Sequence, residues 1–302
     1  MDPLTRSYYG KEFQLAFLRK KGTEFQNWFV DLMGYAFGAD FDPVRAYGPK
    51  GDFKCDGRHV PLGRIHQCYA PDSMRDVETI AKINNDFNGA RAHWPEFMKR
   101  WCFVHNDTRG LPPTVVQHLD ILRQQHATIT IETWGEAALR DIVMGLPLEK
   151  LTLAFGPAPT TLLLDKLGFD DLKPIIDALA QSDPDAANVL LAPPSAAKLE
   201  RNDLSADVAD FLRIGRRKEP LVDEYMHKMV WPDTPEKIAE AIREKYQGLR
   251  RIGLAPDAIY AHLELFVGVQ GEPRRKAAAL AILSYFFERC DIFEDVDDEA
   301  RP

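Results

Sequence analysis

Several features that define common protein classes are missing from this chain. It has only four cysteines among 302 residues, Cys55, Cys68, Cys102 and Cys290, and no C-x-x-C pair. Their spacing indicates neither a zinc site nor a disulfide framework, so we expect reduced and mostly buried thiols. The sequence also lacks an apolar run as long as a membrane span and the basic-then-apolar start of a signal peptide. We therefore expect a cytoplasmic protein that does not engage a membrane.

Charge and motif content exclude further classes. The net charge is −8, with 46 acidic and 38 basic residues. Such a balance argues against coating nucleic acid by bulk electrostatics, although it leaves room for a local groove. The G-x-S-x-G, P-loop and G-x-G-x-x-G patterns are missing, so no motif in the sequence indicates a serine hydrolase, an ATPase or a dinucleotide-binding enzyme. The remaining composition, 45% apolar and 28% charged, is that of a globular chain long enough for two domains.

The most informative stretch is residues 51–71. Two apolar-alternating runs flank the Pro61-Leu62-Gly63 turn, which predicts a β-hairpin. The first strand then carries three charged side chains on one face, Asp52, Lys54 and Asp56, and the second carries Gln67 and Tyr69 on one face. Residues opposite one another on paired strands lie about 5 Å apart, which is within reach of one divalent cation. The same pattern is also typical of an edge hairpin with a solvated charged face.

Hydrophobic periodicity predicts an α/β domain around this hairpin. The expected elements are a helix over 11–37 that breaks near Gly22, an extended segment over 41–47, the hairpin, and then helices and strands over 73–99, 101–105, 113–125, 127–134 and 135–144. We expect Thr23 and Ser73 to cap the helices that follow them. Glu24 lies in the first turn after Thr23, where the helix dipole or a site facing the sheet would explain a carboxylate.

The string Gly51-Asp-x-x-x-Asp-Gly57, followed by Gln67-x-Tyr69, resembles the Mrr-like branch of the PD-(D/E)XK restriction-endonuclease superfamily. The resemblance implies an α/β restriction-endonuclease-like core (αβββαβ). It places the family's catalytic Asp at Asp56 and its strand-borne Glu or Gln at Gln67, with the helical Glu at or near Glu24. The departure from the family pattern is Tyr69, which stands where the family has its catalytic lysine.

This resemblance implies phosphodiester hydrolysis with a divalent cation. Mg²⁺, or Mn²⁺ in its place, takes oxygen ligands, and Asp56, Gln67 and Asp52 are the expected ones, with Glu24 as a further candidate. A lysine normally stabilises the transition state, and Tyr69 carries no positive charge at neutral pH. Two lysines are candidates to replace it, Lys82 on the helix after the hairpin and Lys54 on the strand face of Asp56. Either lysine is also explained as an ordinary surface residue.

The second half of the chain has a different character. Prolines punctuate residues 146–200, which we interpret as a connecting segment with one helix near 172–180, after a nuclease-like domain over 1–145. Helical periodicity then covers 205–215, 221–229, 235–253, 256–269 and 274–290, which predicts an all-α domain over 201–302. Several of its motifs, Asn202–Ser205, Pro220–Tyr225, Leu254–Ile259 and Tyr285–Phe293, resemble the C-terminal domain of effectors from ABC-three-component antiphage systems of the Lamassu type.

Together the two resemblances imply a metal-dependent DNA endonuclease effector of a bacterial antiviral defence complex, active against phage or plasmid. Its expected partners are double-stranded DNA, an SMC/Rad50-like ATPase that holds it in check, and a small third subunit, with homo-oligomerisation on activation. The alternative is a catalytically inactive adaptor that uses the nuclease fold to bridge subunits or hold DNA. A stand-alone repair or restriction nuclease is a third reading, although the acidic charge and the large helical domain favour dependence on a partner.

Overall fold

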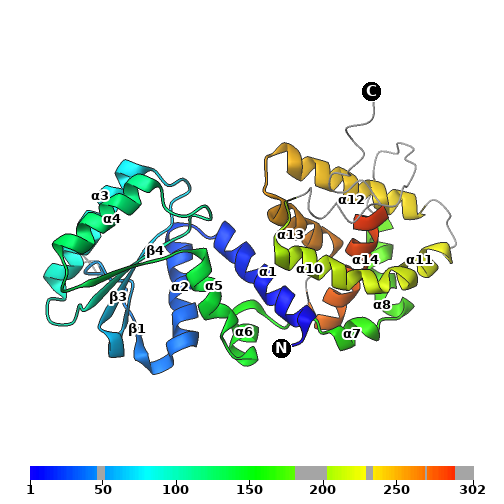
Figure 1. The fold of residues 1–302 in the computed structure, drawn as a ribbon. Helices are drawn as coiled ribbons and strands as arrows, with labels where there is room; N and C mark the ends of the chain where they lie inside the picture. The colour runs from blue at the N-terminus through cyan, green and yellow to red at the C-terminus, as the bar shows by residue number, and fades with distance from the viewer. Residues whose placement is uncertain (46–51, 181–202, 229–233, 269–270, 290–302) are drawn as a thin grey trace. The chain divides into compact units, whose positions relative to one another are not determined.

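The computed structural model describes residues 1–45, 52–180, 203–228, 234–268 and 271–289, which divide between two compact units. The α/β unit is Ala16–Phe155, and the helical unit combines Met1–Leu15 with the described residues from Gly156 onward. Figure 1 shows the sheet of the first unit and the helices of the second. The borders between the two units therefore fall after residues 15 and 155, whereas the sequence predicted domain borders after residues 145 and 200.

The α/β unit follows the predicted order of elements. After the end of α1 (Pro3–Arg19) come α2 (Gly22–Phe37), β1 (Phe41–Pro43), β2 (Gly57–His59), β3 (Arg64–Tyr69), α3 (Asp76–His93), β4 (Arg100–His105), α4 (Pro113–Gln125), β5 (Thr130–Trp134), α5 (Glu136–Met144) and α6 (Leu148–Phe155). The predicted order of an interrupted helix, three strands, and then three helices alternating with two strands is confirmed up to α5. Helix α6 packs against α2, which extends the unit beyond residue 145.

One five-stranded mixed sheet, in the order β1-β2-β3-β4-β5, forms the centre of this unit. The β1–β2 and β2–β3 pairs are antiparallel, and the β3–β4 and β4–β5 pairs are parallel. One face packs on α3 and α4 around Ile65, Trp101 and Phe103, with the Phe87 and Trp101 rings 5.4 Å apart. On the other face, His66 lies 5.4 Å from the ring of Phe29 in α2. Alternate residues of β3 therefore face opposite helical layers.

The expected first strand of the hairpin is wrong over residues 52–56. This segment is a turn in which Phe53 and Lys54 have φ values of 55° and 60°, and β2 begins only at Gly57. The Asp52 carboxylate accepts a hydrogen bond from the Lys54 amide at 2.8 Å, which stabilises such a turn in preference to a strand. The hairpin itself is confirmed, because the Pro61–Gly63 connection joins β2 to β3. Gly51 lies outside the described residues.

Two expected helix caps are also wrong. The N-cap of α2 is Lys21, and the N-cap of α3 is Arg75, so neither Thr23 nor Ser73 holds that position. The prediction of buried, reduced cysteines is confirmed for Cys55, Cys68 and Cys102. The fourth cysteine, like the end of the 285–293 motif, lies outside the described residues.

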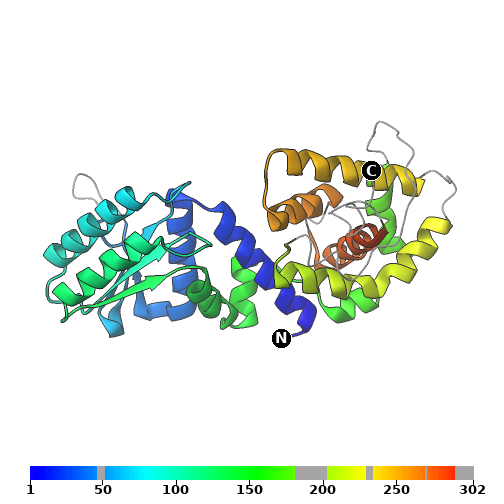
Figure 2. The same ribbon diagram turned by 45° about the horizontal axis from the view of Figure 1, so that its top comes forward.

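The helical unit is built around α14 (Pro273–Arg289). The other described helices are α7 (Thr161–Asp165), α8 (Phe169–Ala180), α10 (Ala206–Gly215), α11 (Glu219–His227), α12 (Thr234–Arg251) and α13 (Pro256–Val267). Helix α14 packs against α7, α8, α10, α11 and α13, and Figure 2 shows it at the centre of these helices. The helices expected after residue 200 are confirmed, and Ser205 caps α10, whereas α7 lies in the expected connecting segment. None of the helices in the described ranges has the length and apolar character needed to cross a membrane.

The first fifteen residues belong to the helical unit, which sequence reasoning missed. Tyr9 donates a hydrogen bond to the Gly156 carbonyl at 3.3 Å, and Thr5 donates one to the Pro159 carbonyl at 3.0 Å. Lys11 is 1% exposed and forms ion pairs with Glu264 and, at 3.1 Å, with Glu12. A buried, paired lysine anchors the start of α1 to helix α13.

Candidate functional site

Asp56 lies directly before β2 and is almost completely buried, with 1% of its surface exposed. Its backbone amide donates to the His66 carbonyl at 2.9 Å, so the residue is fixed against β3. Its carboxylate oxygen Oδ2 accepts from the Cys68 amide at 2.6 Å. The second oxygen, Oδ1, is buried and has no hydrogen-bond partner among the described residues.

Gln67 lies in β3, on the face that α3 and α4 cover. Its neighbours two positions away, Ile65 and Tyr69, pack into the core on that face, and side chains alternate along a strand. The Gln67 side chain is buried, and within the described ranges its oxygen Oε1 has no hydrogen-bond donor. Most buried polar atoms in proteins are paired, so two unpaired acceptors on adjoining segments indicate a site for a donor or a cation. This arrangement brings together the two residues that the resemblance singled out.

The two candidate lysines meet at a residue that sequence reasoning missed. Lys54 Nζ lies 3.3 Å from Asp86 Oδ1, and Lys82 Nζ forms an ion pair with Asp86 Oδ2. Asp86 belongs to α3 and is fully buried, while the two lysine side chains are 36% and 31% exposed. The available signal was an acid on the buried stripe of α3, beside Ile83 and Phe87.

Gly89 makes room for this arrangement on the surface of α3. A Cβ atom at this position would lie 2.6 Å from Cγ of Lys54, so a larger residue would displace the lysine stem. The left-handed backbone of Lys54 directs its side chain from the 52–56 turn to the helix. Both lysines are therefore held at one carboxylate, which keeps their charges on the α3 side of the site.

The electrostatics of the site centre on Asp56. Burial raises the pKa of its carboxyl to about 7, and the negative charges of Asp52 and Asp86 act in the same direction. The hydrogen bond from the Cys68 amide and the positive charge of Lys82 lower that pKa. A carboxyl that titrates near neutral pH, next to a held lysine, is characteristic of functional sites.

Two predicted site residues, Glu24 and Asp52, do not join Asp56 and Gln67. Glu24 is exposed on α2, and its carboxylate pairs with Lys20 at 2.7 Å. Asp52 accepts from the Lys54 amide and acts on Asp56 through its charge alone. The Tyr69 ring packs 6.1 Å from that of Phe103, so at the family's lysine position this chain has a core residue.

The donor set suits a hard cation better than a zinc ion. Across the part of the chain that the structure describes, no group of three or more His, Cys, Asp or Glu residues is arranged to hold a metal. Mg²⁺ often takes only one or two carboxylates and completes its shell with water and phosphate oxygens. The unpaired Oδ1 of Asp56 and Oε1 of Gln67 are oxygen donors of that kind.

A comparison with protein families matches the C-terminal part of the chain. Residues 170–294 match the model of C-terminal domain 10 of the ABC-three component (ABC-3C) systems. The match supports membership of the chain in such a system and indicates a defence-related component with partner subunits. The matched range begins after the α/β unit ends, so it carries no information about the Asp56 site. Neither the curated proteins nor the solved structures provide a match.

Proposed function

We propose that this component of an ABC-three component system is a metal-dependent endodeoxyribonuclease that acts at Asp56 and Gln67. The observation that carries the proposal is the pair of buried oxygens, Asp56 Oδ1 and Gln67 Oε1, that have no donor within the described ranges. An unpaired buried polar group costs about 1–3 kcal/mol, so a fold retains such a group where it serves a function. The likeness of the surrounding motif to PD-(D/E)XK nucleases supports the same reading.

Each residue of the site has a role in this reaction. Asp56 and Gln67 would hold Mg²⁺ or Mn²⁺, which supplies Lewis-acid polarisation of the phosphate and activation of water when bound. Asp56 has to be ionised to do so, which its raised pKa of about 7 permits at slightly alkaline pH. The ammonium groups of Lys54 and Lys82, which Asp86 holds, would stabilise the charge that develops on the phosphate.

Lys82 is the better candidate for the lysine that Tyr69 does not supply. Its charge is among those that lower the pKa of Asp56, which places it within electrostatic reach of that carboxylate. Lys54 shares the Asp86 carboxylate but is not among those charges. We expect Lys82→Met to reduce cleavage by about 100-fold and Lys54→Met by less, because one held cation is the commoner requirement of such sites.

The family match of the helical unit indicates that the chain works with partner subunits. We propose that the domain matched over residues 170–294 docks the chain on an SMC/Rad50-like ATPase and a small third subunit, which restrain the nuclease until double-stranded DNA is engaged. Two observations favour a rival function as an inactive adaptor: the described residues contain no group of three or more His, Cys, Asp or Glu residues arranged to hold a metal, and Tyr69 is partly buried against Phe103.

Asp56→Asn separates the two functions, because the asparagine still offers an oxygen to the Cys68 amide. We expect the variant to assemble with its partners but to lose plasmid cleavage in Mg²⁺ and protection against phage. The control is Asp52→Asn, which removes a nearby charge but no unpaired buried oxygen, and should retain cleavage. Full cleavage and protection by Asp56→Asn would support the adaptor.

A further inference from the structure

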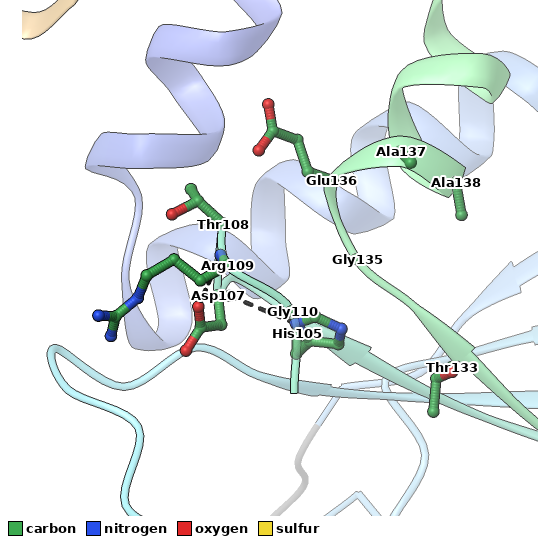
Figure 3. A pocket seen from close by; sticks show the side chains of 10 residues that line it. All are labelled: His105, Asp107, Thr108, Arg109, Gly110, Thr133, Gly135, Glu136, Ala137 and Ala138. Atoms are coloured by element: carbon green, nitrogen blue, oxygen red, sulfur yellow. Dashed lines mark hydrogen bonds between the residues drawn. The ribbon is translucent and has the colours of Figure 1, made fainter. Parts of the chain in front are cut away.

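A second site lies at the carboxyl ends of β4 and β5, in the same unit. An open cleft of about 520 Å³ is bordered by His105, the loop 107–110 and the first turn of α5 (Figure 3). Asp56, Gln67 and the lysines that pair with Asp86 are not among its lining residues. Crevices at the carboxyl ends of parallel strands are common ligand sites in α/β folds.

The first turn of α5 offers hydrogen-bond donors to this cleft. The helix starts after Gly135, whose residue type provides no side-chain cap, and Glu136, Ala137 and Ala138 line the cleft. The first amides of an α-helix have no partner within the helix, and they carry the positive end of the helix dipole. Together they form a site suited to an anion.

His105 supplies an independent indication of a ligand. It is only 5% exposed, and its Nδ1 accepts a hydrogen bond from the Asp107 amide at 3.3 Å. The proton of the neutral ring is therefore on Nε2, which has no hydrogen-bond acceptor among the described residues. Burial lowers the pKa of His105 to about 4, so the ring is neutral at pH 7.

Gly135 places the imidazole next to the helix start. A Cβ atom at Gly135 would lie 2.7 Å from Cε1 and 2.8 Å from Nε2 of His105, so only glycine lets the two approach in this way. His105 and the residues Ala137 and Ala138 of the first turn of α5 therefore line the same cleft. A single acceptor group with several oxygens would satisfy their donors together.

Three charged side chains border the cleft, the Arg109 guanidinium and the carboxylates of Asp107 and Glu136. Arg109 is exposed and lines the cleft, and its backbone amide donates to Asp107 Oδ1 at 2.9 Å. That bond occupies one oxygen of the Asp107 carboxylate. In Figure 3 the Glu136 carboxylate extends away from His105, so it does not fill the space between the ring and the helix start.

We propose that this cleft binds the phosphate group of a nucleotide, either free or at the 5′ end of a nucleic-acid strand. The amides of α5 and Nε2 of His105 are the donors, and the Arg109 guanidinium, which extends away from His105 in Figure 3, adds its positive charge at the rim. A volume of about 520 Å³ is in the range of small-molecule sites and leaves room for a sugar and a base beside the phosphate. The proposal goes beyond nuclease activity and does not depend on Asp56.

The test is direct binding by the full chain in EDTA, with AMP and adenosine as a matched pair of probes. We expect AMP to bind at least about tenfold more tightly than adenosine, because only AMP offers phosphate oxygens to the donors. Oligonucleotides of one sequence with a 5′-phosphate or a 5′-hydroxyl then distinguish strand ends from free nucleotides. Equal binding of AMP and adenosine, or binding of neither, would overturn the proposal.

Variants connect that binding to the cleft. Ala137→Glu introduces a carboxylate at an exposed position of the first turn of α5, where the helix dipole favours an acid and folding is retained. We expect AMP to bind about tenfold or more weakly. The control is Ala206→Glu, at the exposed first residue of α10 in the helical unit, which should bind AMP as the unaltered chain does.

Two further variants separate this site from the proposed nuclease site. Arg109→Gln should weaken AMP binding, whereas Asp56→Asn should abolish cleavage and leave AMP binding unchanged. Unchanged AMP affinity in both Ala137→Glu and Arg109→Gln would show that the nucleotide binds elsewhere. Loss of AMP binding in Asp56→Asn would show that AMP binds at the Asp56 site and would overturn the assignment to this cleft.

Discussion

The two units both bury charged side chains, and they differ in how these are satisfied. In the helical unit Lys11 is 1% exposed, and its ammonium group pairs with Glu264 and Glu12. In the α/β unit Asp56 is equally buried, but its Oδ1 has no donor in the described ranges, and the same holds for Oε1 of Gln67. The Lys11 site pairs its buried charge within the fold, as Asp86 does with two lysines, whereas the Asp56 site leaves acceptors without a donor.

This difference distinguishes buried polar groups that stabilise the fold from buried polar groups that are kept for function. A buried ion pair with both members present tolerates its desolvation, and removing one member leaves an uncompensated charge. A buried acceptor without a donor already destabilises the folded state by its desolvation cost. Replacing it with an apolar group removes that cost and should stabilise the protein. The two kinds of site therefore predict stability changes of opposite sign, which the following variants test.

The largest loss of stability is expected from Lys11→Met. The substitution leaves the Glu264 carboxylate buried without its partner, which we expect to cost up to about 5 kcal/mol. Urea unfolding followed by hydrogen exchange in residues 3–15 and α13 measures this loss. The control is Lys173→Met, which removes an exposed pair with Asp177 and should change stability far less, because water screens that pair. Similar losses in the two variants would show that the Lys11 pair does not hold the unit together.

The next effect has the opposite sign and depends on pH. The pKa of Asp56 is about 7 in the folded chain, against 3.8 for the ordinary carboxyl, so the folded state binds more protons between these values and loses stability as pH rises. Asp56→Asn removes that penalty. Without divalent cations we expect it to stabilise the chain by at most about 4 kcal/mol at pH 8 and to have little effect at pH 3.5. Denaturation midpoints across this range measure the difference, and a gain that grows toward acid pH would contradict the account.

Gln67→Met tests the second open acceptor with a side chain of similar shape. Removing Oε1 takes away an unpaired buried group, so we expect a gain of about 1–3 kcal/mol without divalent cations. The measurement is chemical denaturation at pH 7. The matched comparison is Ser284→Ala, in the helical unit, because the Ser284 hydroxyl donates to the Leu212 carbonyl at 3.1 Å and its removal should lower stability. A loss of stability in Gln67→Met would mean that its amide is satisfied in the apo protein.

The smallest effect is expected at Glu24. Its carboxylate forms an exposed pair with Lys20, so Glu24→Gln should change stability by less than about 0.5 kcal/mol. Cleavage in Mg²⁺ should also be unchanged, because no contact in the described residues brings Glu24 to Asp56. A loss of cleavage above tenfold would restore Glu24 as a member of the site, as the sequence resemblance implied.

Local patterns in the sequence predicted most elements but not all contacts between them. The stripe of α3, the strand at 101–105 and the helix at 113–125 follow from periodicity, and Asp56 and Gln67 follow from a motif. The strand over 52–56 was wrong because Asp52 bonds to the Lys54 amide and favours a turn. Asp86 stands out in the sequence only as an acid on the buried stripe of α3, and its pairing with both lysines depends on the packing of α3 beside that turn. The pairing of Lys11 with Glu264 joins residues far apart in the chain, which local patterns do not report.

Electron paramagnetic resonance of Mn²⁺ added to the full chain asks most directly whether the open oxygens of Asp56 and Gln67 bind a divalent cation. We expect one bound Mn²⁺ whose affinity increases from pH 6 to pH 8 as Asp56 ionises. We also expect at least about tenfold weaker binding in Asp56→Asn and Gln67→Met, although both variants should be more stable, and little change in Asp52→Asn. Equal Mn²⁺ affinity in all four proteins, or no binding by the unaltered chain at millimolar Mn²⁺, would rule out a cation site at these oxygens.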